Sequence, residues 1–232
     1  MDAKNYLIVG GSSGIGLEIA KALHEKNNAV YVASRSNDAL ADLDGVHHLR
    51  LDVQAESFEF EGLPDVLDGI AYCPGTIRLK PFHRLTIDEF LEDWQVNFLG
   101  AVKTIQACLP RLKKATTGTA IVLFSTVAVK TGMPFHASVA GAKAAVEGLT
   151  RSLAAEFAPR IRVNAIAPGY FESDMTGELT DRQKKWIVRQ TALRRLGAVA
   201  DLVGVVRFLT GTEAVVGLAM ITWSASFVFI EM

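Results

Sequence analysis

Residues 7–16 read Leu-Ile-Val-Gly-Gly-Ser-Ser-Gly-Ile-Gly and decide the fold, because a cluster of glycines joins a short apolar run to the start of a helical pattern. Gly10 allows a tight turn, Gly14 allows the backbone to approach a pyrophosphate, and Gly16 allows a helix to pack on a strand. Unpaired N–H groups at the start of that helix favour a phosphate charge. An ordinary strand-to-helix turn does not require glycine at all three positions. The segment therefore predicts a dinucleotide-binding loop built from backbone.

Short apolar runs alternate with helical patterns along the rest of the chain. The predicted strands are 6–9, 29–33, 48–51, 69–73, 120–124, 162–166 and 218–223. The predicted helices are 14–26, 86–113, 138–157, 181–191 and 199–210. Strands that are apolar on both faces and alternate with helices predict a parallel sheet. The expected fold is α/β: a single-domain Rossmann fold over residues 1–232, with a doubly wound seven-stranded parallel sheet and helices on both faces.

Composition narrows the class of protein. A chain of 232 residues is long enough for one domain with a sizeable core, and 50% hydrophobic with 21% charged residues excludes a disordered or fibrous chain. The 24 basic and 25 acidic residues nearly cancel, which favours neither nucleic acid nor a membrane surface as partner. Cys73 and Cys108 alone build neither a disulfide framework nor a zinc site, so no metal is expected. With no visible secretory signal, a cytoplasmic location is predicted.

The C-terminal stretch 214–230 is uncharged, and its 17 residues lie at the short edge of the length that a membrane helix needs. Its β-branched and aromatic content favours a buried strand instead. The last part, 226–230, is strongly apolar. Burial against a partner subunit, burial across a substrate cleft, and packing within the monomer all remain open for it.

The residues after the second and third strands bear on the choice of dinucleotide. Arg35 lies 19 residues after Gly16, where a carboxylate would bind the 2′-hydroxyl of an NAD ribose. An arginine there binds a 2′-phosphate instead, which predicts NADP(H) in preference to NAD(H). A solvated surface arginine is the alternative. Asp52 could accept a hydrogen bond from the adenine amino group or cap a helix.

At this point the chain resembles the short-chain dehydrogenase/reductase family, and within it the 3-oxoacyl-acyl-carrier-protein reductases, over residues 5–223. The glycines of the loop match the family's Thr-Gly-x-x-x-Gly-x-Gly, with Val9 at the threonine. Tyr72 and Cys73 replace both asparagines of its Asn-Asn-Ala-Gly segment, which ends here at Gly75. Asn97 matches the helix asparagine that the family uses in a proton relay.

The resemblance also implies a cofactor site. Pro168, Gly169 and Ser173 are similar to the Pro-Gly-x-x-x-Thr stretch that contacts the nicotinamide. The predicted cofactor-binding residues are Gly10, Ser12, Ser13, Gly14, Ile15, Gly16, Arg35, Asp52, Val53, Gly75, Asn97, Lys143, Pro168, Gly169 and Ser173.

The family's catalytic residues carry over with one exception. Asn97, Thr126 and Lys143 are the predicted catalytic residues, with Thr126 at the family's serine. Val139 occupies the position of the tyrosine that donates the proton, four residues before Lys143 on the same helix face. Ser138 points roughly 100° away around the helix. His136 could reach inward from the preceding loop, or be an ordinary loop histidine.

Two function classes therefore compete. The first is an NADP(H)-dependent oxidoreductase that acts on a carbonyl or secondary alcohol with altered proton delivery. The second is a catalytically impaired, dinucleotide-binding pseudoenzyme with a structural or regulatory role, and an engineered Val139 is a third explanation of the same residue.

The family resemblance also implies a homodimer or homotetramer assembled through helices 86–113 and 138–157. A lid at 170–197 offers an apolar lining for a hydrophobic or acyl substrate, or is simply amphipathic; its candidates are Tyr170, Phe171, Met175, Leu179 and Trp186.

Overall fold

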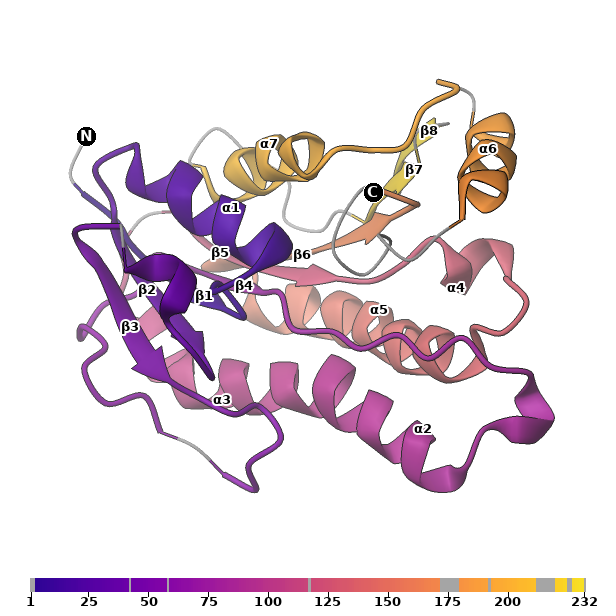
Figure 1. The fold of residues 1–232 in the computed structure, drawn as a ribbon. Coiled ribbons are helices and arrows are strands. Elements are labelled where there is room, and N and C mark those ends of the chain that lie inside the picture. The colour runs from indigo at the N-terminus through magenta and orange to yellow at the C-terminus, as the bar shows by residue number, and fades with distance from the viewer. Residues whose placement is uncertain are drawn as a thin grey trace.

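One mixed sheet organises the chain in the computed structural model, which describes residues 3–41, 43–57, 59–116, 118–171, 180–191, 193–211, 220–224 and 227–231. Its strands are β1 (Asn5–Val9), β2 (Ala29–Ser34), β3 (Val46–Arg50), β4 (Gly69–Tyr72), β5 (Thr119–Phe124), β6 (Ile161–Pro168), β7 (Met220–Ser224) and β8 (Phe227–Glu231). The helices are α1 (Gly14–His24), α2 (Ile87–Trp94), α3 (Gly100–Leu112), α4 (Ala128–Thr131), α5 (Ala137–Phe157), α6 (Asp181–Gln190) and α7 (Val199–Thr210). Figure 1 shows their arrangement.

The strand order is β3-β2-β1-β4-β5-β6-β7-β8, so the order along the chain reverses beside β1. Val9 at the end of β1 pairs with Ala33 of β2 on one side and with Tyr72 of β4 on the other. At such a switch point the connections that follow two neighbouring strands run in opposite directions, and a crevice forms outside the carboxyl ends of these strands. The glycine loop that follows β1 therefore opens into this crevice.

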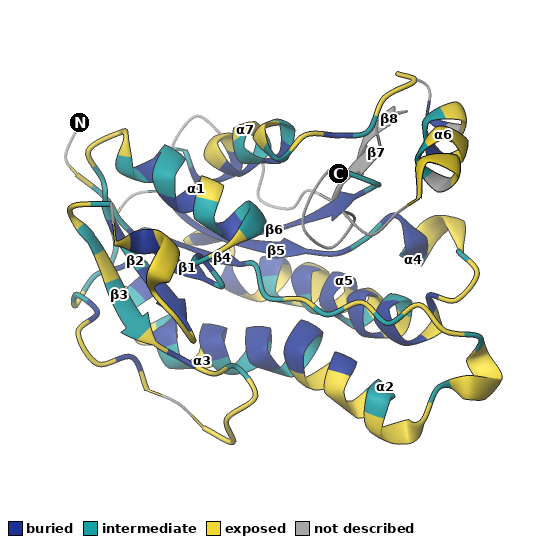
Figure 2. Cartoon of the chain, viewed as in Figure 1, coloured by how far each residue is buried: buried dark blue, intermediate teal, exposed yellow. Residues whose placement is uncertain are grey.

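Helices cover both faces of the sheet, as Figure 2 shows by the buried sides that they turn toward it. On one face, α1 and α7 pack Ile19 and Leu202 against β1 and its neighbours. On the other face, α3 and α5 pack Ile105 and Val146 against the alternate side chains of the same strands. Central strands are buried on both sides because two helical layers enclose them, and β5 is buried along its whole length.

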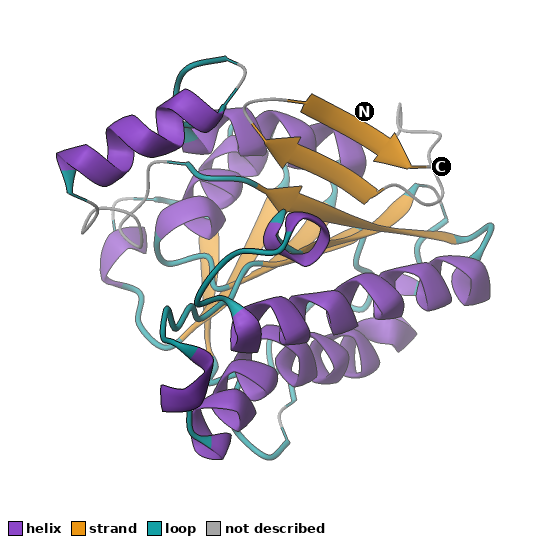
Figure 3. Ribbon diagram, turned by 90° about the vertical axis from the view of Figure 1, so that its right-hand side faces the viewer, coloured by secondary structure: helices purple, strands orange, loops and turns teal. Residues whose placement is uncertain are grey.

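The predicted α/β fold with a doubly wound parallel sheet is confirmed, and one strand is added to it. Strands β1 to β7 correspond to the seven predicted strands, whereas the apolar tail forms β8, which pairs antiparallel with β7 (Figure 3). The register of this pair places Trp223 opposite Val228 and Ile221 opposite Ile230. The prediction of seven strands missed β8 because an antiparallel neighbour needs only a short connection and no crossover helix.

The predicted helix 86–113 is one continuous helical run with a change of winding in its middle. Between α2 and α3, residues Gln95–Leu99 form a π-helical turn. Such turns insert an extra residue into the helix and are frequent at functional sites. Asn97 lies inside it. In the part of the chain that the structure describes, no helix is long and apolar enough to cross a membrane.

Candidate active site

Two adjoining cavities lie at the carboxyl ends of the strands. The larger, of about 520 Å³, extends from the glycine loop to the ends of β2 and β3. The smaller, of about 170 Å³, lies between the ends of β4, β5 and β6 and the start of α5. Both are lined by Ile15, Cys73, Gly75, Thr76 and Phe171. A long ligand in the larger cavity would thus present one end to the smaller cavity.

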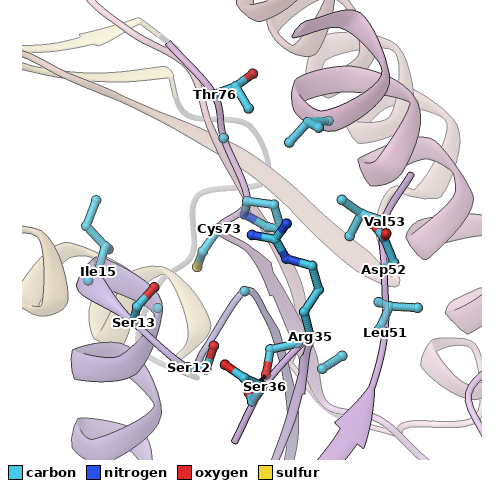
Figure 4. Close-up of a pocket in the computed structure, with 18 of the residues that line it drawn as sticks. Ser12, Ser13, Ile15, Arg35, Ser36, Leu51, Asp52, Val53, Cys73 and Thr76 are labelled. Carbon is cyan, nitrogen blue, oxygen red and sulfur yellow. Dashed lines mark hydrogen bonds between the residues drawn. The ribbon is translucent and has the colours of Figure 1, made fainter. Parts of the chain in front are cut away.

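The glycine loop forms one wall of the larger cavity, and its geometry needs the predicted glycines. Gly10 and Gly14 have φ of +73° and +51°, which side chains other than glycine rarely adopt. A Cβ on Gly16 would lie 2.3 Å from the carbonyl oxygen of Gly10, whereas a Cβ on Gly14 would meet nothing within 4 Å. Gly14 is therefore open toward the cavity. Ser13 precedes α1 without a side-chain cap bond, and Figure 4 shows Ser12, Ser13 and Ile15 around the opening.

Arg35 and Asp52 lie at the far end of the same cavity. Arg35 is exposed and extends from the end of β2 across the cavity, as Figure 4 shows. Among the described residues it has no carboxylate partner, so its guanidinium is available to an anion. Asp52 Oδ1 accepts a hydrogen bond of 3.0 Å from the N–H of Gln54. Asp52 therefore caps a turn, not a helix, and Val53 lines the cavity beside it.

Asn97 is fully buried and fixed by a polar network at the edge of the smaller cavity. Its Nδ2 donates to Thr76 Oγ1 at 2.9 Å and to the carbonyl of Asp93 at 2.9 Å. Its Oδ1 accepts from the N–H of Thr76 at 3.3 Å. Nearby, the Tyr72 hydroxyl donates to the carbonyl of Val96 at 2.6 Å. Tyr72 thus belongs to the core beneath the π turn and does not narrow the cavity.

Thr76 and Asp93 are site residues that the sequence analysis missed. Asp93 is completely buried, and the Thr76 hydroxyl donates to its Oδ1 at 2.6 Å. Arg78 Nε lies 3.9 Å from the same oxygen. The available signal was position: Asp93 precedes Asn97 by four residues, which places it on the same face of the helix.

Lys143 projects from α5 into the smaller cavity and is only 8% exposed. Burial lowers its pKa to about 8, although Cys73 and Asp93 act in the opposite direction. A Cβ on Gly75 would lie 3.2 Å from Asn97 Oδ1 and 3.7 Å from Lys143 Nζ. Glycine at this position therefore keeps both groups accessible. Burial raises the pKa of the Cys73 thiol to about 12, so this thiol stays protonated at neutral pH.

Two hydroxyls follow β5, and they have different roles. Thr126 lines the smaller cavity, and its Oγ1 accepts from the N–H of Ala128 at 3.3 Å. Its own hydrogen remains available to a ligand. Ser125 is buried and donates to Glu147 Oε1 at 2.7 Å, which ties the end of β5 to α5. Ser125 also lines the cavity, but its hydrogen is engaged by Glu147, so Thr126 is the one of the two hydroxyls whose hydrogen can serve a ligand there.

The start of α5 supplies the rest of this wall. Val139 is 4% exposed and lines the smaller cavity with Lys143, so an aliphatic side chain borders the lysine there. His136 is 7% exposed and lines the same cavity. It is therefore not a surface loop residue. Ser138 is buried but does not line the cavity, in agreement with its predicted direction.

The lid candidates and the residues predicted to contact the nicotinamide divide into three groups. Pro168, Gly169, Tyr170 and Phe171 line the smaller cavity, and the ends of the lid meet where the N–H of Gly197 donates to the carbonyl of Tyr170 at 3.1 Å. Trp186, on α6, is 61% exposed and lines neither cavity. Its predicted place in the apolar lining is wrong, because α6 buries Ile187 instead. Ser173, Met175 and Leu179 lie outside the described residues.

Comparison with known proteins identifies the family. Residues 9–219 match a family profile described as enoyl-(acyl carrier protein) reductase. A 3-oxoacyl-acyl-carrier-protein reductase of Staphylococcus aureus is 32% identical over 227 residues, which cover 91% of this chain and 92% of the relative. The chain belongs to the short-chain dehydrogenase/reductase family, and the relatives to which it is similar at this level of identity are oxidoreductases.

Further relatives agree with this assignment. A 3-oxoacyl-acyl-carrier-protein reductase of Aquifex aeolicus is 32% identical over 225 residues, which cover 90% of each chain. The crystal structure of a 3-oxoacyl-acyl-carrier-protein reductase of Brucella melitensis superimposes with a TM-score of 0.85 at 29% identity, covering 97% of this chain and 91% of that one.

Proposed function

We propose that the chain is an NADP(H)-dependent oxidoreductase that interconverts a carbonyl group and a secondary alcohol. The observation that carries this proposal is the junction of the two cavities, where Asn97 and Lys143 border a glycine at position 75 and Thr126 faces the same space. The apolar part of the lining, which includes Ile77, suits a hydrophobic or acyl substrate.

The residues of the larger cavity fit a dinucleotide. The open side of Gly14 and the start of α1 suit a pyrophosphate, because backbone N–H groups and the helix dipole favour its charge. Arg35 would bind a 2′-phosphate, and Asp52 with Val53 would border the adenine. Lys143 and Asn97 would lie at the nicotinamide ribose. Bound there, the nicotinamide supplies or accepts a hydride.

Binding at this site and positioning of a substrate do not require a tyrosine. Thr126 can donate a hydrogen bond to a carbonyl oxygen, and Lys143 carries a positive charge below pH 8 that favours negative charge developing there. A general acid contributes about 10²–10⁴-fold to rate, and positioning contributes separate factors. Activity is therefore expected with Val139 at the position that we assign to the family's tyrosine.

One observation favours a second candidate, a dinucleotide-binding pseudoenzyme. Val139 is buried beside Lys143 and has no proton to give. A protein that keeps the fold and the larger cavity could bind the cofactor without turning over a substrate.

Cofactor titration together with a carbonyl-reduction screen separates the two candidates. We expect titration calorimetry to show tighter binding of NADPH than of NADH, and NADPH oxidation in the presence of ketones or aldehydes, including long-chain ones. Binding of NADPH without oxidation by any member of a broad panel would favour the pseudoenzyme. Failure to bind either dinucleotide would contradict both candidates.

We also propose that the chain forms a homodimer or homotetramer through α2, α3 and α5. Ile87, Leu91 and Trp94 are 73%, 55% and 38% exposed, and their spacing places them on one face of α2. An apolar face of this kind is typical of a protein interface. Analytical ultracentrifugation should detect at least a dimer, and a monomer at micromolar concentration would contradict the proposal.

A further inference from the structure

A reaction at the smaller cavity needs a group that gives a proton to the carbonyl oxygen. We propose that His136 is this group and acts as general acid for reduction and general base for oxidation, which rests on the proposed function. The assignment depends on where His136 lies, how its ring is held, and which other groups share the cavity.

His136 belongs to the same wall as Lys143. It immediately precedes α5, and residues three and seven positions further along a helix return to the same side. Those positions are Val139 and Lys143, and all three side chains line the smaller cavity together with Thr126. The imidazole therefore borders the part of the cavity beside Val139, which a tyrosine at position 139 would fill with its phenol ring.

The ring of His136 is oriented by the backbone. Its Nδ1 lies 2.8 Å from the carbonyl oxygen of Pro134, and a carbonyl oxygen can only accept a hydrogen bond. Nδ1 therefore carries a hydrogen, and Nε2 is the nitrogen that gains and loses a proton. A hydrogen-bond acceptor at one ring nitrogen fixes the tautomer and the orientation of the ring, so that the other nitrogen is the one that exchanges a proton with the substrate. The carbonyl of His136 in turn accepts from the N–H of Ala140 at 2.8 Å, which holds the residue at the helix start.

The other titratable groups that line the cavity are less suited to this task. They are Cys73 at the end of β4 and Tyr170 after β6, together with Lys143 on α5, whose ammonium we have already assigned to the nicotinamide ribose and to the negative charge that develops on the substrate oxygen. Burial raises the pKa of the Cys73 thiol to about 12 and also raises the pKa of the Tyr170 phenol. Both groups are therefore weak acids here. Imidazole is the side chain that most often serves as general acid and base in catalysis.

The step balances with the residues and the cofactor class already proposed. In reduction, the carbonyl carbon gains a hydride from the reduced nicotinamide, the C=O π bond breaks, and its electron pair passes to oxygen. That oxygen takes the proton from Nε2 of His136. The products are the alcohol, the oxidised nicotinamide and neutral His136, which recovers a proton from water.

The test compares His136→Gln with the matched change His83→Gln at an exposed histidine outside both cavities. We expect His136→Gln to lower kcat for carbonyl reduction by about 10²–10⁴-fold, to leave NADPH affinity within about threefold, and to remove one ionisation from the pH–rate profile. His83→Gln should change none of these. In His136→Ala, added imidazole should restore part of the lost rate, which keeps the test informative if the glutamine variant folds poorly.

Failure of this inference and failure of the proposed function give different results. If the unmodified chain reduces carbonyls and His136→Gln does so at a similar rate, or if Tyr170→Phe alone removes the ionisation, His136 is not the proton donor although the proposed function stands. If the unmodified chain binds NADPH and reduces no carbonyl, the proposed function fails and this inference fails with it. Nitrogen NMR of the cofactor-free protein gives a readout without turnover: a ring protonated at Nε2 and not at Nδ1 would also overturn the assignment.

Discussion

The two cavities are built in different ways, although they adjoin. The wall of the larger cavity at the glycine loop is mostly backbone, and its shape depends on residues whose side chains are absent. The smaller cavity is built from side chains that come from the ends of β4, β5 and β6, the π turn and the start of α5. Replacement of one side chain can therefore change the chemistry of the smaller cavity without changing the fold.

The difference also explains how a valine can occupy the site at which we propose the reaction. Val139 is buried among residues that face the cavity, and it contributes nothing to the glycine loop. Loss of Gly16, by contrast, would place a Cβ 2.3 Å from the carbonyl oxygen of Gly10, so the loop itself would have to shift. The end at which we propose that the pyrophosphate binds is constrained by sterics, whereas at the proposed reaction end a side chain can change without a backbone clash of this kind.

The largest expected effect comes from restoring a phenol to the reaction end. In the His136→Gln background, Val139→Tyr should place a hydroxyl beside Lys143, whose charge lowers the pKa of a neighbouring phenol. We expect carbonyl reduction to rise by about 10²–10⁴-fold relative to His136→Gln, as measured by NADPH oxidation under single-turnover conditions.

Val139→Phe in the same background is the matched control, since it adds the ring without the hydroxyl. Overpacking would destabilise both variants by about 1–3 kcal/mol, so thermal unfolding should be measured for each. Equal rates for the tyrosine and phenylalanine variants, both folded and both binding NADPH, would show that the cavity no longer accommodates the phenol in a useful position.

The sequence predicts these two regions unequally well. The turn at Gly10 and the close helix packing at Gly16 could be predicted, because a short stretch of chain defines both steric demands, whereas the close approach of Gly11 to Val32 could not. The π turn and the buried Asp93 could not, since helical periodicity does not report the winding of one turn or the partner of a carboxylate. The orientation of His136 depends on the carbonyl of Pro134, and the place of Tyr72 depends on the carbonyl of Val96. Such contacts with backbone carbonyls leave no pattern in a sequence.

The second prediction tests the backbone-built wall. Gly16→Ala would bring a Cβ to 2.3 Å from the carbonyl oxygen of Gly10, so the loop must shift. We expect NADPH affinity to fall on the order of 100-fold or more, equivalent to about 2.7 kcal/mol, by titration calorimetry.

Gly204→Ala is the control, because nothing lies within 4 Å of a Cβ there. It should stabilise α7 by about 0.5–1 kcal/mol and leave NADPH binding unchanged. Equal affinities for the two variants would mean that the loop tolerates a side chain.

The third prediction concerns the cost of burying Lys143. Between pH 8 and 10.5 the folded state has released the lysine proton while the unfolded state still holds it, so stability rises with pH across this window. Lys143→Met removes this dependence. The unmodified chain should therefore gain up to about 3 kcal/mol in its free energy of unfolding from pH 7 to pH 10.5, compared with Lys143→Met. Urea titrations of both proteins without cofactor measure this difference. Lys113→Met, at an exposed lysine of the helix C-cap, should show no comparable trend. A constant difference for Lys143→Met across this range would contradict the assigned pKa.

The smallest effect is expected at the far end of the larger cavity, where one side chain supplements the backbone. A hydrogen bond to a charged group contributes about 1.5–3 kcal/mol, so Arg35→Ala should weaken NADPH binding by roughly 10- to 100-fold. NADH lacks the 2′-phosphate, and its affinity should change by less than about twofold. Arg35→Lys keeps the charge but loses the planar fork, so it should fall between the alanine variant and the unmodified protein. Titration calorimetry with both cofactors on all three proteins measures this directly. Equal affinities of the unmodified chain for NADPH and NADH, or an equal loss for both in Arg35→Ala, would show that Arg35 does not read the 2′-position and that the backbone wall alone determines cofactor binding.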